Sequence, residues 1–329
     1  MSPFIKKRVA IIGAGIAGLS CASELVKAGF DVHVFDKSKG VGGRMSHRYF
    51  QEWEADHGAQ YFTVKDPLFS GQVNEWLSAK VIAPWDGRIV SLNRESIHSI
   101  EASTLRYVGV PAMTAPAKYL AQSLNVHTQH TVTELKQINQ LWRITTKEQG
   151  TFDCAFEYLI CAIPSVQARA LIGSHSVNLN EICANVVMLP CWTLIGYFKQ
   201  PLDLGFDGAF VESSPFSWLA RDNTKPGRSL YETWVAQASN TWSQEHLDLN
   251  HYEIEPILLQ AFKDLTKLDC DLYQTHLWRY AKLETPSELN YAYDEAIRVG
   301  LCGDWLKNST VEGAWISGHR MAHHLISNT

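Results

Sequence analysis

Two glycine-rich segments near the N-terminus contain the residues whose types and spacing best suggest chemistry. The first, Gly13-Ala14-Gly15-Ile16-Ala17-Gly18, is a G-x-G-x-x-G sequence, and Asp36 and Lys37 follow eighteen and nineteen residues after its last glycine. In this pattern the first glycine permits a tight turn, the second lets the backbone approach a pyrophosphate, and the third allows a helix to pack closely on a strand. The carboxylate can accept hydrogen bonds from a ribose diol. The segment therefore predicts a dinucleotide site.

The flanking residues predict the elements that would position this site. Residues 9–12 form a short apolar run, which is typical of a parallel strand buried on both faces. An amphipathic helical pattern then continues to Gly29, and residues 32–35 form a second strand that ends at Asp36. Strand, turn, helix, strand and acid in this order favour nucleotide binding over a purely structural glycine turn. The helix would offer free N–H groups and a positive dipole end to the phosphates.

The second glycine-rich turn covers residues 39–44, and Gly43, Arg44 and Met45 lie at its end. It resembles the G-G-R continuation of flavoproteins of the amine oxidase superfamily, where this turn lies against the FAD diphosphate. Residues 56–63 resemble the segment of that superfamily that passes the isoalloxazine ring, and they include Gly58, Ala59, Gln60 and Tyr61. The resemblance implies FAD, rather than NAD, as the cofactor.

The C-terminal region carries the same resemblance. Residues 299–304 form an apolar strand that closes on Gly303-Asp304, and a last helix opens with Gly313 and Ala314. In related flavoproteins the aspartate binds the ribityl chain, and the helix N-terminus faces flavin N1 and O2. A helix N-terminus there stabilises the negative charge of a reduced flavin. By the same resemblance, Val132 on a predicted hairpin would contact the adenine.

Together with Trp278-Arg279-Tyr280-Ala281, these segments resemble renalase-like FAD oxidoreductases. Such relatives oxidise misformed dihydronicotinamide isomers of NAD(P)H and pass the electrons to dioxygen, which gives hydrogen peroxide. The resemblance implies the same kind of small-molecule donor and O2 as the acceptor. It is looser through the middle of the chain, and Asp36 stands where most of these proteins have Glu. No cysteine has the context of a flavin-linking site, so the resemblance implies non-covalent FAD.

No catalytic base can be assigned from the sequence, and hydride transfer from an electron-rich dihydropyridine needs none. The candidate substrate-pocket residues are Gln60, Tyr61, His276, Trp278, Arg279 and Trp305. Strand alternation over 272–280 places His276 and Trp278 on one face and Arg279 on the other. Three other functions stay open: oxidation of an amine to an imine, a flavin-binding redox sensor or chaperone without turnover, and an NAD-binding module without flavin.

The pattern of elements predicts an α/β protein with two domains. We expect a discontinuous, Rossmann-like FAD-binding domain of the glutathione-reductase type, over residues 1–72, 112–170 and 295–329. Residues 73–111 and 171–294 would form a second, mainly antiparallel α+β substrate domain. Its strand patterns lie at 192–198, 209–212, 217–220, 230–235 and 272–280, and one amphipathic helix is predicted over 250–267.

Composition excludes several classes of protein. The chain has 329 residues, 46% hydrophobic and 19% charged, which excludes disorder. With 29 basic and 34 acidic side chains it lacks the basic footprint of a nucleic-acid-binding protein, and no apolar run is long enough to span a membrane. The basic and apolar start resembles a secretory signal, but its spaced glycines favour a cytoplasmic protein. The seven cysteines are predicted as small core residues, and most of the eleven tryptophans as core residues too.

No metal site is predicted. His319 and His323 stand four apart on the last helix, with His324 beside them, and no third ligand is near them in the sequence. They are interpreted as ordinary helix histidines. Asp269 and Asp271 are interpreted as part of a solvated turn, and the serines show no hydrolytic triad.

Overall fold

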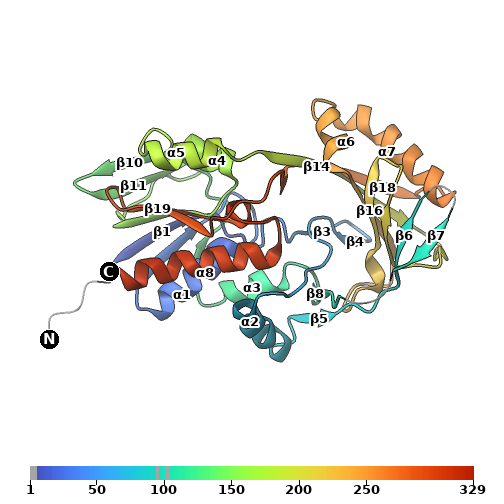
Figure 1. Cartoon of the computed structure of the whole chain (residues 1–329), viewed down its shortest axis with the longest axis horizontal. Coiled ribbons are helices and arrows are strands. Elements are labelled where there is room, and N and C mark those ends of the chain that lie inside the picture. The colour runs from blue at the N-terminus through green and yellow to red at the C-terminus, as the bar shows by residue number, and fades with distance from the viewer. Residues whose placement is uncertain (1–5, 94–95, 101–103) are drawn as a thin grey trace.

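The structure, a computed structural model, describes residues 6–93, 96–100 and 104–329. Two large sheets lie beside each other along the long axis of the molecule, each covered by helices (Figure 1). None of the described helices is long and apolar enough to cross a membrane.

The first sheet has six strands and contains the predicted nucleotide-binding unit. Its order is β19 (Tyr291–Asp294), β20 (Val299–Cys302), β13 (Tyr158–Cys161), β1 (Arg8–Ile12), β2 (Asp31–Phe35) and β9 (Asn125–His127). All neighbours are parallel except the edge pair β19 and β20. The order agrees with a doubly wound sheet, in which ligands bind beyond the carboxyl ends of the strands.

Both faces of this sheet are buried. Along β1, Val9 and Ile11 join one apolar cluster and Ala10 and Ile12 join another, because successive side chains of a strand point to opposite faces. The first cluster is completed by α1 (Ile16–Lys27), α3 (Ala115–Ala121) and α8 (Val311–Ser327). The second is completed by β10 (Val132–Ile138), β11 (Leu141–Thr146), α4 (Ser165–Ile172) and α5 (Val177–Ala184) (Figure 1). Double coverage confirms the predicted α/β fold.

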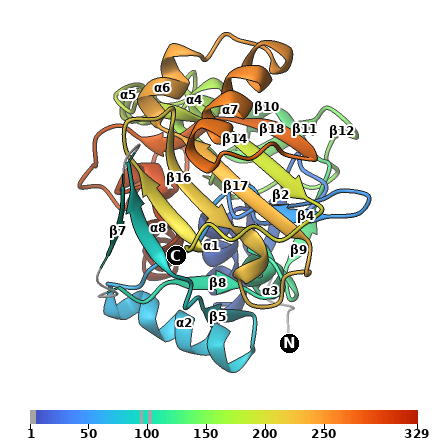
Figure 2. The ribbon, with the colours of Figure 1, turned by 90° about the vertical axis from the view of Figure 1, so that its right-hand side faces the viewer.

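The second sheet has seven strands and is mainly antiparallel, as predicted (Figure 2). Its order is β18 (Leu272–Leu283), β14 (Met188–Phe198), β17 (Glu232–Ala238), β16 (Phe216–Arg221), β15 (Gly208–Val211), β6 (Ile89–Leu92) and β7 (Ile97–Ser99). Helix α7 (His251–Thr266) covers one face, and Ile254, Leu258 and Phe262 pack into that core. The helix begins where predicted because Asn250 and Glu253 form a capping box.

Shorter elements complete the fold. They are β3 (His47–Tyr49), β4 (Glu54–Asp56), α2 (Pro67–Ser78), β5 (Ile82–Pro84), β8 (Tyr107–Gly109), β12 (Gly150–Thr151), α6 (Asn240–Glu245) and the 3-10 turns Asp222–Thr224 and Asp304–Leu306. The β3–β4 hairpin packs Trp53 and Ala55 against Ile195 and Val235, on the face of the seven-stranded sheet opposite α7. This hairpin therefore lies at the junction of the two halves.

Two helices near the predicted domain boundaries pack on the six-stranded sheet. Val73 and Trp76 of α2 join the core of the six-stranded sheet, so the predicted boundary after residue 72 lies inside a helix of the nucleotide-binding half. Leu179 of α5 and Met188 at the start of β14 join that half as well. The chain thus crosses to the other half near residue 188 and returns with β19, because amphipathic helices that follow β13 pack back onto its sheet.

The aromatic and sulfur-containing side chains lie mostly where predicted. All the tryptophans except Trp242 and Trp278 are buried. Five of the cysteines are buried as small core residues: Cys21, Cys161, Cys183, Cys191 and Cys302. Trp278 is the exception that matters for function, because it lies in the wall of a cleft.

Candidate functional site

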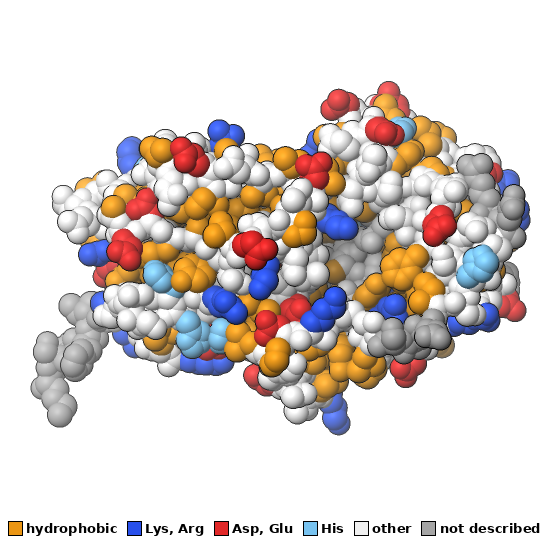
Figure 3. All heavy atoms as spheres, viewed as in Figure 1, with side chains coloured by type: hydrophobic (Ala, Val, Ile, Leu, Met, Phe, Trp, Pro, Cys, Tyr) orange, Lys and Arg blue, Asp and Glu red, His pale blue; other side chains and the backbone are white. Residues whose placement is uncertain are grey.

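A cleft of about 1520 Å³ extends from the carboxyl ends of β1 and β2 to the β14, β17 and β18 strands of the other sheet. Pockets for single small ligands usually measure roughly 300–1,000 Å³, so this cleft has room for a dinucleotide and a second molecule. The space-filling view is hollowed between the two halves of the molecule, and Lys or Arg side chains lie at the edge of the hollow (Figure 3).

The two glycine-rich turns form one end of the cleft and are joined to each other. Gly13 has a φ of +110°, which glycine adopts without strain, and its N–H donates to the carbonyl oxygen of Phe35. The Gly42 N–H donates to the carbonyl oxygen of Ala14 at 2.9 Å, which brings the second turn against the first. Gly15, the N-cap of α1, has no heavy atom within 4 Å of the place where a Cβ would stand. Its lack of a side chain leaves the space open on the cleft side.

Asp36 lies at the end of β2, in the wall of the cleft. Its Oδ2 accepts from the Ala14 N–H at 2.7 Å and its Oδ1 from the Ser38 N–H at 2.8 Å. Each carboxylate oxygen has a second lone pair, so both can still accept from a ribose hydroxyl. Asp36 therefore fixes the first turn and remains able to bind a sugar.

A buried acid and the start of α8 form the opposite side of this end. Arg44 donates from Nη1 to Oδ2 of Asp304 at 2.9 Å, and its Nη2 contacts Oδ1, so the pair is bidentate. Arg44 also donates to the carbonyl oxygen of Ala281 at 3.2 Å, which ties the second turn to β18. Val311 and Ala314 of the first turn of α8 line the cleft. The N-termini of α1 and α8 thus face the same space.

The far end of the cleft has an aromatic wall made of His57, His276 and Trp278. The His57 ring stacks on Trp278 with centroids 5.1 Å apart, and His276 meets both rings edge-on at 5.0 and 4.4 Å. The Trp278 indole donates to the carbonyl oxygen of His57 at 3.0 Å. Burial, with His276 and Arg48 nearby, lowers the pKa of His57 to about 3, and burial with Arg48 lowers the pKa of His276 to about 4. Both rings are therefore neutral at physiological pH.

Behind this wall, a buried ionic network joins the two halves. Arg228 donates to the carboxylate of Asp56 through Nε at 3.1 Å and also through Nη2. Lys225 donates to Asp222 at 2.7 Å and to Oε1 of Gln60 at 3.0 Å. Although burial opposes ionisation, Lys225 and Arg228 hold the pKa of Asp56 well below its usual range, whereas burial prevails at Asp222 and raises its pKa.

Most of the residues predicted from the sequence meet in the wall of the cleft. They are Gly13, Gly15, Ile16, Ala17, Asp36, Lys37, Gly43, Arg44, Met45, Gly58, Ala59, Tyr61, Val132, His276, Trp278, Arg279, Gly303, Asp304, Trp305 and Ala314. Four others lie behind the wall: Ala14, Gly18, Gln60 and Gly313. Gln60 is buried and bonded to Lys225, and a Cβ on Gly313 would lie 2.7 Å from the backbone carbonyl oxygen of Asn308, so this glycine is required by a close approach within the protein.

The predicted alternation along residues 272–280 breaks near its end. Cys191 pairs with Trp278 but Leu189 pairs with Lys282, so a bulge in β18 shifts the register there. Leu277, Trp278, Arg279 and Tyr280 consequently all reach the cleft wall.

Several cleft residues were not predicted, and three of them matter for the aromatic end of the cleft. His57 lies within the segment 56–63, and its place between Asp56 and Gly58 was the available signal. Arg48 comes from the short strand β3, which the sequence pattern did not predict. Gln237 donates from Nε2 to the carbonyl oxygen of Gly58 at 2.7 Å and lies beyond the predicted end of its strand.

Comparison with known proteins agrees with this architecture. Residues 11–76 match the NAD(P)-binding Rossmann-like domain family. Among sequence relatives, a zeta-carotene-forming phytoene desaturase of Myxococcus xanthus is 50% identical over 38 residues, 12% of this chain and 7% of that protein. An L-amino-acid oxidase of Crotalus adamanteus is 44% identical over 59 residues, 18% of this chain and 11% of that protein. A 4,4'-diaponeurosporene oxygenase of Staphylococcus haemolyticus is 26% identical over 158 residues, 45% of this chain and 28% of that protein. The chain matches less than a third of the length of each of these relatives.

Solved structures match over nearly the whole chain. A protein assigned as a protoporphyrinogen oxidase from Exiguobacterium sp. 255-15 aligns with a TM-score of 0.79 at 10% identity, over 99% of this chain and 100% of that one. Cyclohexylamine oxidase from Brevibacterium oxydans aligns with a TM-score of 0.75 at 11% identity, over 98% and 99%. Putrescine oxidase bound to putrescine aligns with a TM-score of 0.73 at 12% identity, over 98% and 99%. The chain therefore combines a Rossmann-like nucleotide-binding segment with the two-domain fold that these oxidases share.

Proposed function

We propose that the chain is an oxidoreductase that holds FAD non-covalently in the cleft. The observation that carries this proposal is the space beside Gly15, at the N-terminus of α1, which a Cβ would fill without touching the protein. The first N–H groups of α1 are available at that helix N-terminus, as a pyrophosphate requires. Asp36 would bind a ribose, and Val132 would lie beside the adenine. We propose that each of the two large sheets is the centre of one domain, and that the domain with the six-stranded sheet binds the cofactor.

The cysteines support non-covalent attachment of the cofactor. Among the described residues, Cys191 is the cysteine that lines the cleft. Burial raises its pKa to about 11, so it stays a thiol rather than the thiolate that a covalent link would use. When bound, the flavin supplies the hydride acceptor and passes electrons on to a second substrate, for which dioxygen is the candidate.

The charges of the cleft indicate the class of substrate. Six basic side chains line it, Lys37, Lys39, Arg44, Arg48, Arg279 and Lys282, against two acidic ones, Asp36 and Asp304. The cleft therefore has a formal excess of four positive charges, whereas the whole chain has a net charge of -5. A diphosphate neutralises about two of them, and the remaining excess favours an anionic substrate.

We therefore propose an electron-rich dinucleotide, a dihydronicotinamide isomer of NAD(P)H, as the hydride donor, as the renalase-like resemblance implies. Arg48 and Arg279 would bind its phosphates. His57, His276 and Trp278 would orient its flat ring by stacking, because neutral aromatic faces hold such rings at low entropic cost. Hydride transfer from this donor needs no base, which fits two histidines that remain unprotonated and are poor bases. The electrons would pass to O2 and give hydrogen peroxide.

Amine oxidation is the second candidate, and the fold shared with putrescine oxidase and cyclohexylamine oxidase favours it. The aromatic end could hold an ammonium group against ring faces, but the substrate must lose a proton before hydride transfer, and an acidic or basic partner would favour that loss. Asp304 is paired with Arg44, and the described wall offers no other acid near Trp278. The charge of the cleft is our reason for proposing this candidate second.

Anaerobic stopped-flow bleaching of the bound flavin separates the candidates. The donors are ordinary NADH, NADH enriched in its 2- and 6-dihydro isomers, and a panel of simple amines. Rapid bleaching by the isomers alone supports the proposed donor. Rapid bleaching by an amine overturns it in favour of the second candidate. Slow bleaching by every donor would indicate a flavin-binding redox protein without turnover, and purified protein that cannot take up FAD would overturn the cofactor assignment itself.

A further inference from the structure

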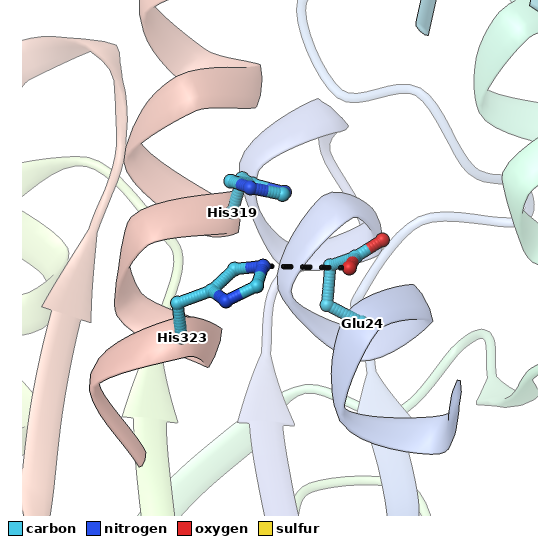
Figure 4. Close-up of side chains that lie close together, drawn as sticks. All are labelled: Glu24, His319 and His323. Atoms are coloured by element: carbon cyan, nitrogen blue, oxygen red, sulfur yellow. Dashed lines mark ion pairs between the residues drawn. The ribbon is translucent and has the colours of Figure 1, made fainter. Parts of the chain in front are cut away.

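Outside the cleft, three metal-ligating side chains meet where α1 and α8 pack together. Glu24 comes from α1, and His319 and His323 stand four apart on α8, so they share one face of that helix. Their ligand atoms all lie within 4.8 Å of one another, and both rings lie beside the carboxylate in the close-up (Figure 4). Among the described residues, this is the one group of three side chains at a metal-binding spacing.

The surrounding contacts hold these ligands in place. Lys27 donates to Oε1 of Glu24 at 2.8 Å, which leaves Oε2 turned toward Nε2 of His323 at 3.6 Å. His319 stacks on Trp315 with ring centroids 4.8 Å apart and planes 18° from parallel. Side chains that orient a ligand from behind are the usual support of a metal site.

Two interactions within this group are incomplete. The gap between His323 and Glu24 is longer than a hydrogen bond. Nδ1 of His319 is shielded from solvent and has no hydrogen-bond partner among the described residues. This ring nitrogen therefore has a lone pair or proton that no described group uses.

We propose that Glu24, His319 and His323 form a Zn²⁺ site that ties α1 to α8. Two imidazoles and one carboxylate are ligands that Zn²⁺ accepts, with water in the fourth position. Bond lengths of about 2.0–2.2 Å place tetrahedral ligand atoms roughly 3.3 Å apart, so small rotations of the three side chains close the site. The sequence did not predict it because the third ligand lies at the other end of the chain.

The site has a structural consequence for the cleft. Both helices that it joins begin at the cleft, where Ile16 and Ala17 of α1 and Val311 and Ala314 of α8 line the wall. A metal that binds only the folded chain stabilises it by mass action. Zn²⁺ is therefore expected to raise the melting temperature and to hold the two helix N-termini in register.

Titration of Zn²⁺ into the tag-free, chelator-treated full chain, followed by calorimetry, tests the site. We expect one equivalent in the wild type, binding at least tenfold weaker in His323→Gln and in Glu24→Gln, and unchanged binding in the matched control His324→Gln. His324 is adjacent on the helix but packs against Tyr291 and Tyr293. Melting temperatures with and without Zn²⁺ should follow the same order.

Two results would overturn the proposal. One is the absence of saturable Zn²⁺ binding by the wild-type chain. The other is wild-type affinity in Glu24→Gln, since this would leave a two-histidine surface contact on α8 that does not join the helices. Neither result depends on flavin binding or on activity.

Discussion

A side chain at residue 15 should abolish FAD binding while leaving the fold intact, because the space beside Gly15 is empty of protein. The φ of -75° at this N-cap is open to any residue, and a Cβ there meets no heavy atom within 4 Å. Valine is a poorer N-cap residue than glycine, which destabilises the fold, but it also lowers the entropy of the unfolded chain, which stabilises the fold. Because these effects oppose each other, Gly15→Val should change the free energy of unfolding of the apo protein by less than about 1 kcal/mol. That corresponds to a shift of melting temperature of about 2–4 °C at most.

The effect on FAD is much larger. The added carbons keep a pyrophosphate from the N–H groups of α1, and each lost hydrogen bond to a charged group is worth about 1.5–3 kcal/mol. Two such bonds correspond to about 3–6 kcal/mol, or a Kd raised roughly 10²- to 10⁴-fold. The assay is calorimetric titration of FAD into apo protein, with flavin absorbance after desalting as a second readout.

Gly71 supplies the matched control. It lies within α2, away from the cleft, and a Cβ there also meets nothing within 4 Å. Gly71→Ala should bind FAD normally and gain about 0.5–1 kcal/mol of stability, since alanine favours a helix interior. Wild-type FAD affinity in a folded Gly15→Val would refute the reasoning and move the pyrophosphate elsewhere.

Three further predictions concern charges. Arg228→Met leaves the buried Asp56 without the guanidinium that donates two hydrogen bonds to its Oδ2, and it should cost about 3–5 kcal/mol in urea unfolding; unchanged stability would mean that the network does not hold the halves together. The folded pKa values of His57 and His276, about 3 and about 4, lie below the ordinary 6.5. As the pH falls, these two histidines therefore take up protons in the unfolded chain before they do so in the folded chain. The free energy of unfolding is highest above pH 6.5 and should decrease as the pH falls toward 4. In His276→Gln the free energy of unfolding should decrease less steeply with pH. Arg48→Gln should raise KM for a dinucleotide donor at least tenfold, with kcat and the KM of an uncharged donor retained; equal losses for both donors would argue against phosphate recognition.

The cofactor half of the cleft could be predicted because its determinants are local in the sequence. A strand, a turn and a helix within thirty residues set the positions of Gly13, Gly15 and Asp36, and the structure places all three in the wall. Ala14 and Gly18 belong to the same motif but act from behind the wall. A Cβ on Gly18 would lie 2.0 Å from the carbonyl oxygen of Gly13, so this glycine serves packing, the role that the motif assigns to it.

The substrate half could be predicted only in part, because its wall is assembled by long-range packing. Arg48, Gln237 and His276 come from β3, β17 and β18, and no pattern within any one of these strands indicates that they meet. The bulge in β18 is a second reason why this wall could not be predicted. The alternation of side chains between the two faces of the strand is correct for Gln274 and His276 but does not hold beyond Trp278. Such a bulge depends on the partner strand β14 as much as on β18 itself. The charge excess of the cleft is partly local and partly long-range: four of its six basic residues lie within residues 37–48, and folding brings Arg279 and Lys282 to the same surface.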